Sequence, residues 1–377
     1  MHAASDTLVV AGISARIMAE SARQGGWRVV ALDLFGDLDT RRASARWAPI
    51  GDPATLAVDP DLLGAALAGA AGEPGIAGWV AGGGFEGAPE LLGAAPPRVP
   101  HLGMGPAQVR ALRDPWQFFP ALDRLGLMHP PVCRDPPPDP AGWLAKRAGG
   151  TGGWHIRDAA DAGPAHPDTY YQRHQPGVPM SALFIADAEA ASLIALNHLI
   201  ARPIGAHPHV YHGAIGPVHD ASLEATVEAA LAALVPTFAL RGLASLDFIA
   251  LDGTPWMLEL NPRPSASMAL HAQAWPAGLM RAHVAAMRGH LPAARSRVGV
   301  RGSQVVYATR ACVVDADEAA ALARVPHCHD IPAAGACYAA GTPVCSVSAA
   351  GDDPASVART LDERTAAIQA RLRACSA

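Results

Sequence analysis

The stretch Leu243–Ser267, LASLDFIALDGTPWMLELNPRPSAS, restricts the fold more than any other part of the chain. Asp252-Gly253 lies between two apolar runs, and this dipeptide is typical of a tight turn between antiparallel strands. We therefore predict a β-hairpin. A helix from about Ser265 to Arg288 is expected to follow it.

Three oxygen-bearing side chains fall on this hairpin. Residues two apart on a strand share a face, so Glu259 and Asn261 point the same way. A three-residue turn, 252–254, would place Asp247 directly opposite Glu259. Two carboxylates and an amide suit Mg²⁺, and Mg²⁺ suggests a nucleotide phosphate. An ordinary polar hairpin is the alternative, but acids on an apolar hairpin are costly unless something binds them.

The composition excludes several classes of protein. The 377 residues are 50% hydrophobic and 17% charged, which is typical of a folded protein of two or three domains. The net charge of −5 argues against nucleic-acid binding. The first residues do not resemble a signal peptide, and no apolar run reaches the ~18 residues of a membrane helix. We expect a soluble, cytoplasmic protein that does not bind a membrane.

The chain uses arginine almost exclusively as its basic residue. Of 29 Lys and Arg residues, only Lys146 is lysine. Lysine offers a compact charge on a flexible stem, where arginine offers a wide planar group. A lysine kept in such a composition is therefore a candidate functional residue, although chance retention is the alternative.

The N-terminal hundred residues show a strand–turn–helix–strand pattern. Strands are predicted at 7–11, 28–32 and 76–81, with a helix to about residue 24. The turns at 12–16 and 82–86 each follow a strand, where open α/β sheets bind ligands, and the first could hold an anion at its helix start. The glycines could also serve only the turns. The full dinucleotide fingerprint is absent, so NAD binding is not indicated.

A glycine-rich segment follows the lone lysine. Trp143–Arg147 is predicted to be a strand, and it leads into the sequence AGGTGG at 148–153 before the next strand. Such a tip can cover phosphates and donate backbone N–H groups to them. Because strands flank it, we favour a mobile flap over a flexible linker.

The C-terminal ninety residues are predicted to combine strands at 303–308 and 344–347 with a helix at about 354–373. The six cysteines form no CxxC pair and are expected to be reduced. Cys328, between His327 and His329, leaves a zinc site conceivable, although the spacing matches no familiar zinc pattern.

The order of these pieces resembles the ATP-grasp superfamily over roughly residues 105–290. The lysine and its glycine loop come first, then the strand with Gln172, the Asp247 strand and the motif Glu259-x-Asn261-x-Arg263. The resemblance implies an N-terminal open parallel α/β domain (1–103) and a two-subdomain ATP-grasp core (104–290, with the flap subdomain at about 143–180). A C-terminal α+β subdomain (291–377) completes the expected α/β and α+β fold.

The resemblance also assigns roles to residues. Asp247, Glu259 and Asn261 would hold Mg²⁺, and Lys146 and Arg263 would act in catalysis. Many members carry a second lysine before the flap domain; here the nearest candidate is Arg113. The residues expected to bind ATP are Lys146, Gly149, Gly150, Thr151, Gly152, Gly153, Gln172 and Arg113. Those expected to face the substrate are Gly12, Ser14, Arg16, Gly84 and Phe85.

The activity implied is ATP-dependent joining of a small-molecule carboxylate to an amine through an acyl phosphate. Members similar to tyramine–glutamate ligases, or linked to one-carbon cofactors of the methanopterin or methanofuran type, suggest small-molecule or cofactor biosynthesis. A homodimer is common in the superfamily. Two alternatives stay open: carboxyphosphate chemistry of the biotin-carboxylase kind, and a non-catalytic nucleotide-binding protein.

Overall fold

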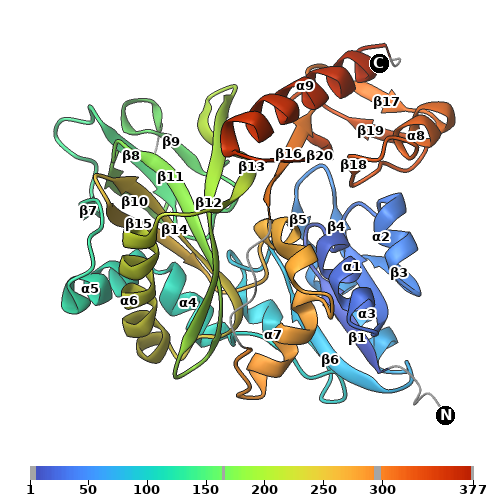
Figure 1. Cartoon of the computed structure of the whole chain (residues 1–377), viewed down its shortest axis with the longest axis horizontal. Helices are drawn as coiled ribbons and strands as arrows, with labels where there is room; N and C mark the ends of the chain where they lie inside the picture. Colours follow the sequence, from blue (N-terminus) through green and yellow to red (C-terminus); the bar gives the residue numbers. More distant parts are fainter. Residues whose placement is uncertain (1–5, 164–165, 293–298, 375–377) are drawn as a thin grey trace.

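The computed structural model describes residues 6–163, 166–292 and 299–374 (Figure 1). Its N-terminal part is a parallel sheet of strand order β3-β2-β1-β6, with helices packed against it. Every residue of β1 is buried, because both faces of a parallel sheet are covered. This confirms the predicted open α/β domain. The elements are β1 (Thr7–Ala11), α1 (Arg16–Gln24), β2 (Arg28–Asp33), α2 (Leu38–Ala43), β3 (Arg46–Pro49), β4 (Gly51–Asp52), β5 (Ala57–Val58), α3 (Pro60–Ala70), β6 (Ile76–Ala81) and η1 (Pro89–Gly93).

Two short helices lead to the flap. The dipeptide Asp114-Pro115 predicts a break between them, because a residue before proline disfavours the helical conformation. The chain does break there, and the Asp114 carboxylate caps the second helix by accepting a hydrogen bond from the Trp116 N–H. The flap is an antiparallel sheet of order β7-β10-β8-β9. The elements are α4 (Pro106–Arg113), α5 (Pro115–Leu125), β7 (Val132–Cys133), β8 (Trp143–Arg147), β9 (Ile156–Asp158), η2 (Ala159–Asp161) and β10 (Thr169–Arg173).

An eight-stranded sheet of order β15-β14-β11-β12-β13-β16-β20-β18 forms the centre of the molecule (Figure 1). Its last three strands come from the C-terminal segment, so that segment continues the central sheet. The elements of this region are β11 (Val178–Asp187), β12 (Ala191–Ile204), β13 (His207–Val218), α6 (Ala221–Phe238), β14 (Arg241–Leu251), β15 (Thr254–Asn261), η3 (Ala266–Ala274), α7 (Leu279–Met287), β16 (Val300–Tyr307), β17 (Cys312–Val314), α8 (Ala316–Leu322), β18 (Cys328–His329), β19 (Ala336–Tyr338), β20 (Pro343–Gly351) and α9 (Pro354–Leu372).

The hairpin β14–β15 has the predicted pairing but not the predicted turn. Leu251 pairs with Thr254, so the turn contains only Asp252 and Gly253, both at positive φ. A bulge at Leu258 adds one residue to β15 and brings Asp247 opposite Glu259. The turn is one residue shorter than predicted, and the bulge adds one residue to β15. The two shifts cancel, so the predicted pair of Asp247 and Glu259 forms although the predicted turn length was wrong.

The predicted helix at 265–288 is also interrupted. A 3₁₀ helix ends at Ala274, and α7 begins only at Leu279. Pro276 lacks the N–H that a continuous helix needs, and Gly278 has a φ of +75°. A Cβ on Gly278 would lie 2.1 Å from the Ser21 carbonyl oxygen, so the break also lets the chain approach α1 closely.

One helix of the described residues, α6, is long and apolar enough to cross a membrane by length and composition alone. Leu223, Val227, Leu231 and Leu234 of this helix are buried, and it packs against β12 and β15. These contacts are those of a core helix in a folded domain.

The N-terminal sheet and the central sheet share one apolar cluster. It joins Leu8 and Val10 of β1 to Leu183 of β11 and Met280 of α7. This shared packing holds the N-terminal sheet against the central sheet, which contains the hairpin β14–β15.

Candidate active site

A cavity of about 540 Å³ lies where three parts of the chain meet. The flap contributes strand residues and its loop, the central sheet contributes a floor, and the N-terminal domain contributes the start of α1 and the turn after β6. Residues that line it include Ile13, Ser14, Gly83, Lys146, Thr151, Gln172, Ser181, Tyr211, Asp247, Glu259, Asn261, Arg263 and Ser267. Segments far apart in sequence therefore converge on the hairpin that carries the three oxygen donors.

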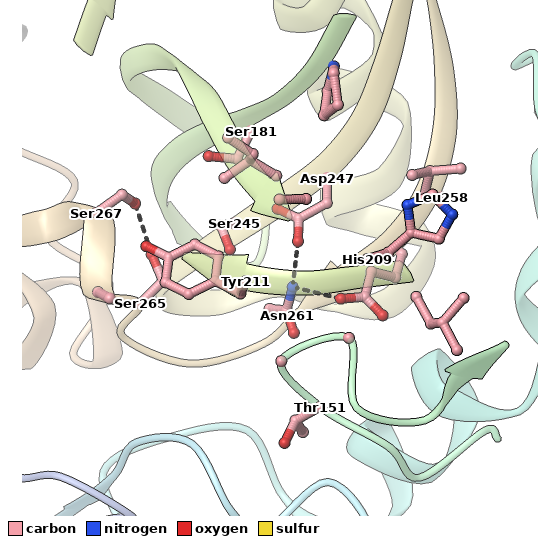
Figure 2. A pocket seen from close by; sticks show the side chains of 18 of the residues that line it. Thr151, Ser181, His209, Tyr211, Ser245, Asp247, Leu258, Asn261, Ser265 and Ser267 are labelled. Carbon is pink, nitrogen blue, oxygen red and sulfur yellow. Dashed lines mark hydrogen bonds between the residues drawn. The ribbon is translucent and has the colours of Figure 1, made fainter. Parts of the chain in front are cut away.

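The predicted trio is assembled on the floor of this cavity. Asn261 Nδ2 donates to Asp247 Oδ2 at 3.0 Å and to Glu259 Oε1 at 3.3 Å (Figure 2). Ser181 and Ser245 lie beside them, since Ser181 pairs with Asp247 and Ser245 with Asn261 across neighbouring strands. The floor is thus polar within a largely apolar sheet.

The two carboxylates of the trio differ strongly in pKa. Burial and the neighbouring Glu259 raise the pKa of Asp247 to about 8. Burial also disfavours the charged form of Glu259, but the charges of Arg113 and Lys146 outweigh it and lower its pKa to about 2. Two acids side by side thus share one negative charge near neutral pH.

This donor set fits Mg²⁺. Carboxylate oxygens and an amide that can present its oxygen are the hard ligands that Mg²⁺ prefers, with phosphate and water completing its shell. Among the described residues no group of three or more His, Cys, Asp or Glu side chains is arranged to hold a metal. A zinc site around Cys328 is therefore not found among the residues that the structure describes. Mg²⁺ prefers octahedral coordination, so three protein donors would leave positions for phosphate and water.

Lys146 projects from β8 toward Gln172 of β10. Its Nζ donates to Gln172 Oε1 at 3.0 Å, and both residues are buried. Gln172 Nε2 is buried without a partner among the described residues. Buried unpaired polar atoms at a cavity wall are costly unless a ligand meets them, and nucleotide phosphates and base atoms could do so.

The glycine loop is closed over the cavity and held from two sides. Arg113 donates to the carbonyl oxygens of Ala148 at 3.1 Å and Gly150 at 2.5 Å, and the Tyr211 N–H donates to the Gly152 carbonyl at 2.9 Å. A Cβ on Gly153 would lie 1.9 Å from the carbonyl oxygen of His209 on β13. Only glycine permits that approach.

Some residues of the glycine loop line the cavity, and others pack against neighbouring parts of the protein. Thr151, Gly152 and Gly153 line the cavity, as the flap prediction requires. Gly149 packs against Gly87 of the N-terminal domain and Gly150 against the His155 ring. These two glycines let the loop fit against its neighbours.

Arg113 and Arg263 lie on either side of the trio. Arg113 Nη1 donates to Glu259 Oε2 at 3.0 Å, so it pairs with a predicted metal ligand and does not line the cavity. Arg263 lines the cavity, and its Nε donates to Glu86 Oε1 at 2.6 Å. Its charge lowers the pKa of Glu86 against the effect of burial.

Glu86 is a site residue that sequence reasoning passed over. It lies two residues after Gly84, at the end of the turn at 82–86, and this position was the available signal. Tyr211 was missed because nothing in its strand marks it. It lies in the cavity near Ser265 and Asn261 (Figure 2). Burial and Asp247 raise its pKa.

The five residues predicted to face a substrate are not all brought into the cavity. Ser14 lines it, whereas Gly12 packs against the turn at Gly83 and Arg16 pairs with Asp330 at 2.7 Å. Gly84 donates its N–H to Glu86. The side chain of Phe85 is buried and packs edge-to-face on Trp79. For Phe85 this is a correction: an aromatic residue after a strand belongs here to the core.

Comparison with known proteins agrees with this geometry. A family described as ATP-grasp domain matches residues 112–267. No curated protein sequence matches the chain. Similar solved structures include N5-carboxyaminoimidazole ribonucleotide synthetase from Thermus thermophilus, at 16% identity and a TM-score of 0.67, with 97% of this chain and 98% of that chain covered.

Two further structures are similar over most of their length. Phosphoribosylamine–glycine ligase from Thermotoga maritima shares 15% identity at a TM-score of 0.66, with 95% of each chain covered. The biotin carboxylase domain dimer of 2-oxoglutarate carboxylase from Hydrogenobacter thermophilus, crystallised with MgADP and bicarbonate, shares 12% identity at a TM-score of 0.70, with 93% of this chain and 87% of that chain covered.

At such identities the likeness shows the fold. The family match adds that residues 112–267 are similar to an ATP-grasp domain.

Proposed function

We propose that the chain is an ATP- and Mg²⁺-dependent ligase that activates a small-molecule carboxylate as an acyl phosphate and joins it to an amine. The observation that carries the proposal is the trio Asp247, Glu259 and Asn261, hydrogen-bonded together on the cavity floor. It lies beneath a closed glycine loop and between Lys146 and Arg263. We further propose a cytoplasmic role in small-molecule or cofactor biosynthesis, including one-carbon cofactors.

The residues match what phosphoryl transfer requires, which is positioning and charge neutralisation more than a protein nucleophile. A bound Mg²⁺ would neutralise the phosphates, with Asp247, Glu259 and Asn261 as its protein ligands. Lys146 supplies a point charge at the flap side. The unpaired Gln172 Nε2 beside it is available to the nucleotide.

Arg263 is placed to act on the other reactant. It lies beside the trio and beside Gly83 of the N-terminal domain: a Cβ on Gly83 would lie 3.6 Å from Arg263 Nε. A carboxylate bound there would meet its guanidinium, and the same charge would stabilise the oxyanion formed when an amine attacks the acyl phosphate. Glu86 holds Arg263 in that position.

The closed loop keeps water away from a reactive acyl phosphate. The loop reaches both the N-terminal domain, at Gly87, and the central sheet, at Tyr211. Excluding water favours attack by the amine over hydrolysis.

A second candidate is carboxyphosphate chemistry, in which bicarbonate takes the place of the carboxylate. The similar Hydrogenobacter domain was crystallised with bicarbonate and MgADP, which is the observation that favours it. A homodimer is a further expectation.

ADP release from ATP and Mg²⁺ tests both candidates. Pooled carboxylates and amines should stimulate it in combination, and omission of either pool should abolish the stimulation. Stimulation by bicarbonate without any added carboxylic acid would favour the second candidate instead. Glu259→Gln, which keeps the side-chain size, should be inactive in either case.

A further inference from the structure

One part of the cavity wall, which we call the acceptor subsite, consists of Ile13, Ile17, Met18 and the segment 264–268. These residues belong to the start of α1 and to the chain after the hairpin, and none of them belongs to the trio or the flap. If the proposed function holds, this part receives the substrates other than ATP. We propose that it takes an acceptor with an apolar, non-phosphorylated body.

The walls of the acceptor subsite are apolar. Ile17 is partly buried, and Met18 and Met268 are 4% and 1% exposed. Met18 also fills the space beside Gly82, where a Cβ would lie 2.7 Å from Met18 Cε. Contact of apolar ligand surface with these side chains is favourable, whereas burial of a charged group against them is unfavourable.

The helix start that would bind a phosphate is already taken by the protein. The first turn of α1 is where the sequence suggested an anion site. The Asp33 carboxylate instead accepts a hydrogen bond from the Ala15 N–H at 3.0 Å, and it also accepts from the Gly36 N–H and from Trp47 Nε1. An internal anion therefore occupies the positive end of the helix.

The arginine nearest to this helix start is also neutralised. Arg16 donates to both carboxylate oxygens of Asp330, at 2.7 and 3.0 Å, and to Glu20 at 3.0 Å. Asp39 lies 3.4 Å away. With three acids around one guanidinium, Arg16 has no charge left for a substrate phosphate.

The remaining cations of the cavity lie elsewhere. Among the described residues that line it, the Lys and Arg side chains are Lys146, Arg173 and Arg263. Lys146 and Arg173 belong to the flap sheet, and Arg263 is paired with Glu86. A phosphorylated acceptor would therefore lack the cluster of basic groups that its two charges require.

Polar recognition in the acceptor subsite is left to neutral groups. The Ser265 and Ser267 hydroxyls lie 2.9 Å apart, on the segment that follows Arg263 in the chain (Figure 2). They can orient an amine or carboxylate at the reacting end while the apolar body lies against Ile17 and Met18. The similar Thermus and Thermotoga enzymes are named for ribonucleotide and phosphoribosyl compounds, so we expect this chain to differ from them in acceptor.

The test measures binding of the neutral apolar dye Nile red to the protein loaded with Mg²⁺ and a non-hydrolysable ATP analogue. Wild type should bind the dye. Ile17→Arg, which places a cation in the acceptor subsite, should weaken dye binding at least ~10-fold. Ile17→Thr, which is β-branched like isoleucine but smaller and carries a neutral hydroxyl, should weaken it less. Leu62→Arg is the matched control, because Leu62 is 44% exposed on α3 and does not line the cavity.

Ribose 5-phosphate serves as the phosphorylated probe and should neither displace the dye from wild type nor raise its thermal unfolding midpoint. Failure of wild type to bind the dye would overturn the proposal, and so would displacement by ribose 5-phosphate. Unchanged dye binding in both Ile17 variants would do the same. The nucleotide analogue is titrated separately in each protein, so loss of nucleotide binding would count against the proposed function while the dye still reports on the acceptor subsite.

Discussion

Replacing Asp247 by asparagine should stabilise the metal-free protein while removing its response to Mg²⁺. Asp247 lines the cavity, where burial and Glu259 raise its pKa to about 8. The folded chain therefore keeps a proton on Asp247 that the unfolded chain loses near pH 4. The free energy of unfolding of wild type should fall as the pH rises from about 4 to about 8, and level off above that. Asparagine does not titrate, so the advantage of the variant grows over the same window.

The size of the effect follows from the pKa difference. About four units correspond to roughly 5 kcal/mol at 1.36 kcal/mol per unit. Asp247 keeps contact with water in the cavity, and the new amide must find partners beside the Asn261 amide, so both terms reduce the gain. We expect Asp247→Asn to be more stable by about 1–3 kcal/mol at pH 8, a rise of roughly 2–8 °C in the unfolding midpoint.

Thermal unfolding in EDTA from pH 5 to pH 9 measures this difference. The control is Asp252→Asn, in the exposed turn of the same hairpin, which should show a difference that does not change with pH. With Mg²⁺ and ATP added, wild type should gain stability and Asp247→Asn should gain much less. A variant that is less stable than wild type at pH 8 without metal, or a stability difference that is constant with pH, would refute the reasoning.

Three further substitutions test the site. Glu259→Gln should keep the fold and lower ADP formation by about 10²–10³-fold; turnover at the wild-type rate would remove Glu259 from the metal set. Lys146→Arg should slow ATP turnover by roughly 10–100-fold, since a planar fork replaces a point charge. Arg147→Lys, at its exposed neighbour, is the control. Equal rates in the two variants would mean that Lys146 was retained by chance and has no special role in turnover. Gly153→Ala should weaken ATP binding about 10-fold by blocking loop closure against β13. Gly163→Ala, at a similar φ of +64° but with no atom within 4 Å of the added Cβ, should leave affinity unchanged in the same titration.

The sequence was sufficient for features that depend on local pattern. Alternation and the Asp-Gly turn gave the hairpin, and Asp114-Pro115 gave the break between α4 and α5. The bulge at Leu258 could not be foreseen, because a bulge depends on how a strand bends against its neighbours and has no residue signature here. The pairing of Asp247 with Glu259 was therefore predicted by way of a turn length that the structure does not have.

Contacts between domains lay beyond sequence reasoning. Glu86 reaches Arg263 across 177 positions, and Arg16 reaches Asp330 across 314. The sequence alone could not distinguish an Arg16 that faces the substrate from an Arg16 that is paired within the protein. Only the packing of the C-terminal segment against the start of α1 decides that Arg16 and Asp330 neutralise each other. The same limit applies to Phe85, whose burial against Trp79 depends on the whole N-terminal layer.

Arg113 links the trio to the glycine loop. Arg113 bonds Glu259 with one part of its guanidinium and two loop carbonyls with the rest. Glu259 is thereby paired with Arg113, while burial and Glu259 favour the protonated form of Asp247 by raising its pKa. Mg²⁺ would have to displace the Asp247 proton and compete with Arg113 for Glu259. Metal affinity should thus rise with pH up to about 8, and loosening of Arg113 would release the loop carbonyls that it holds. Arg113 would therefore couple the proposed metal site to the flap, which differs from the phosphate contact that its place in the sequence suggested.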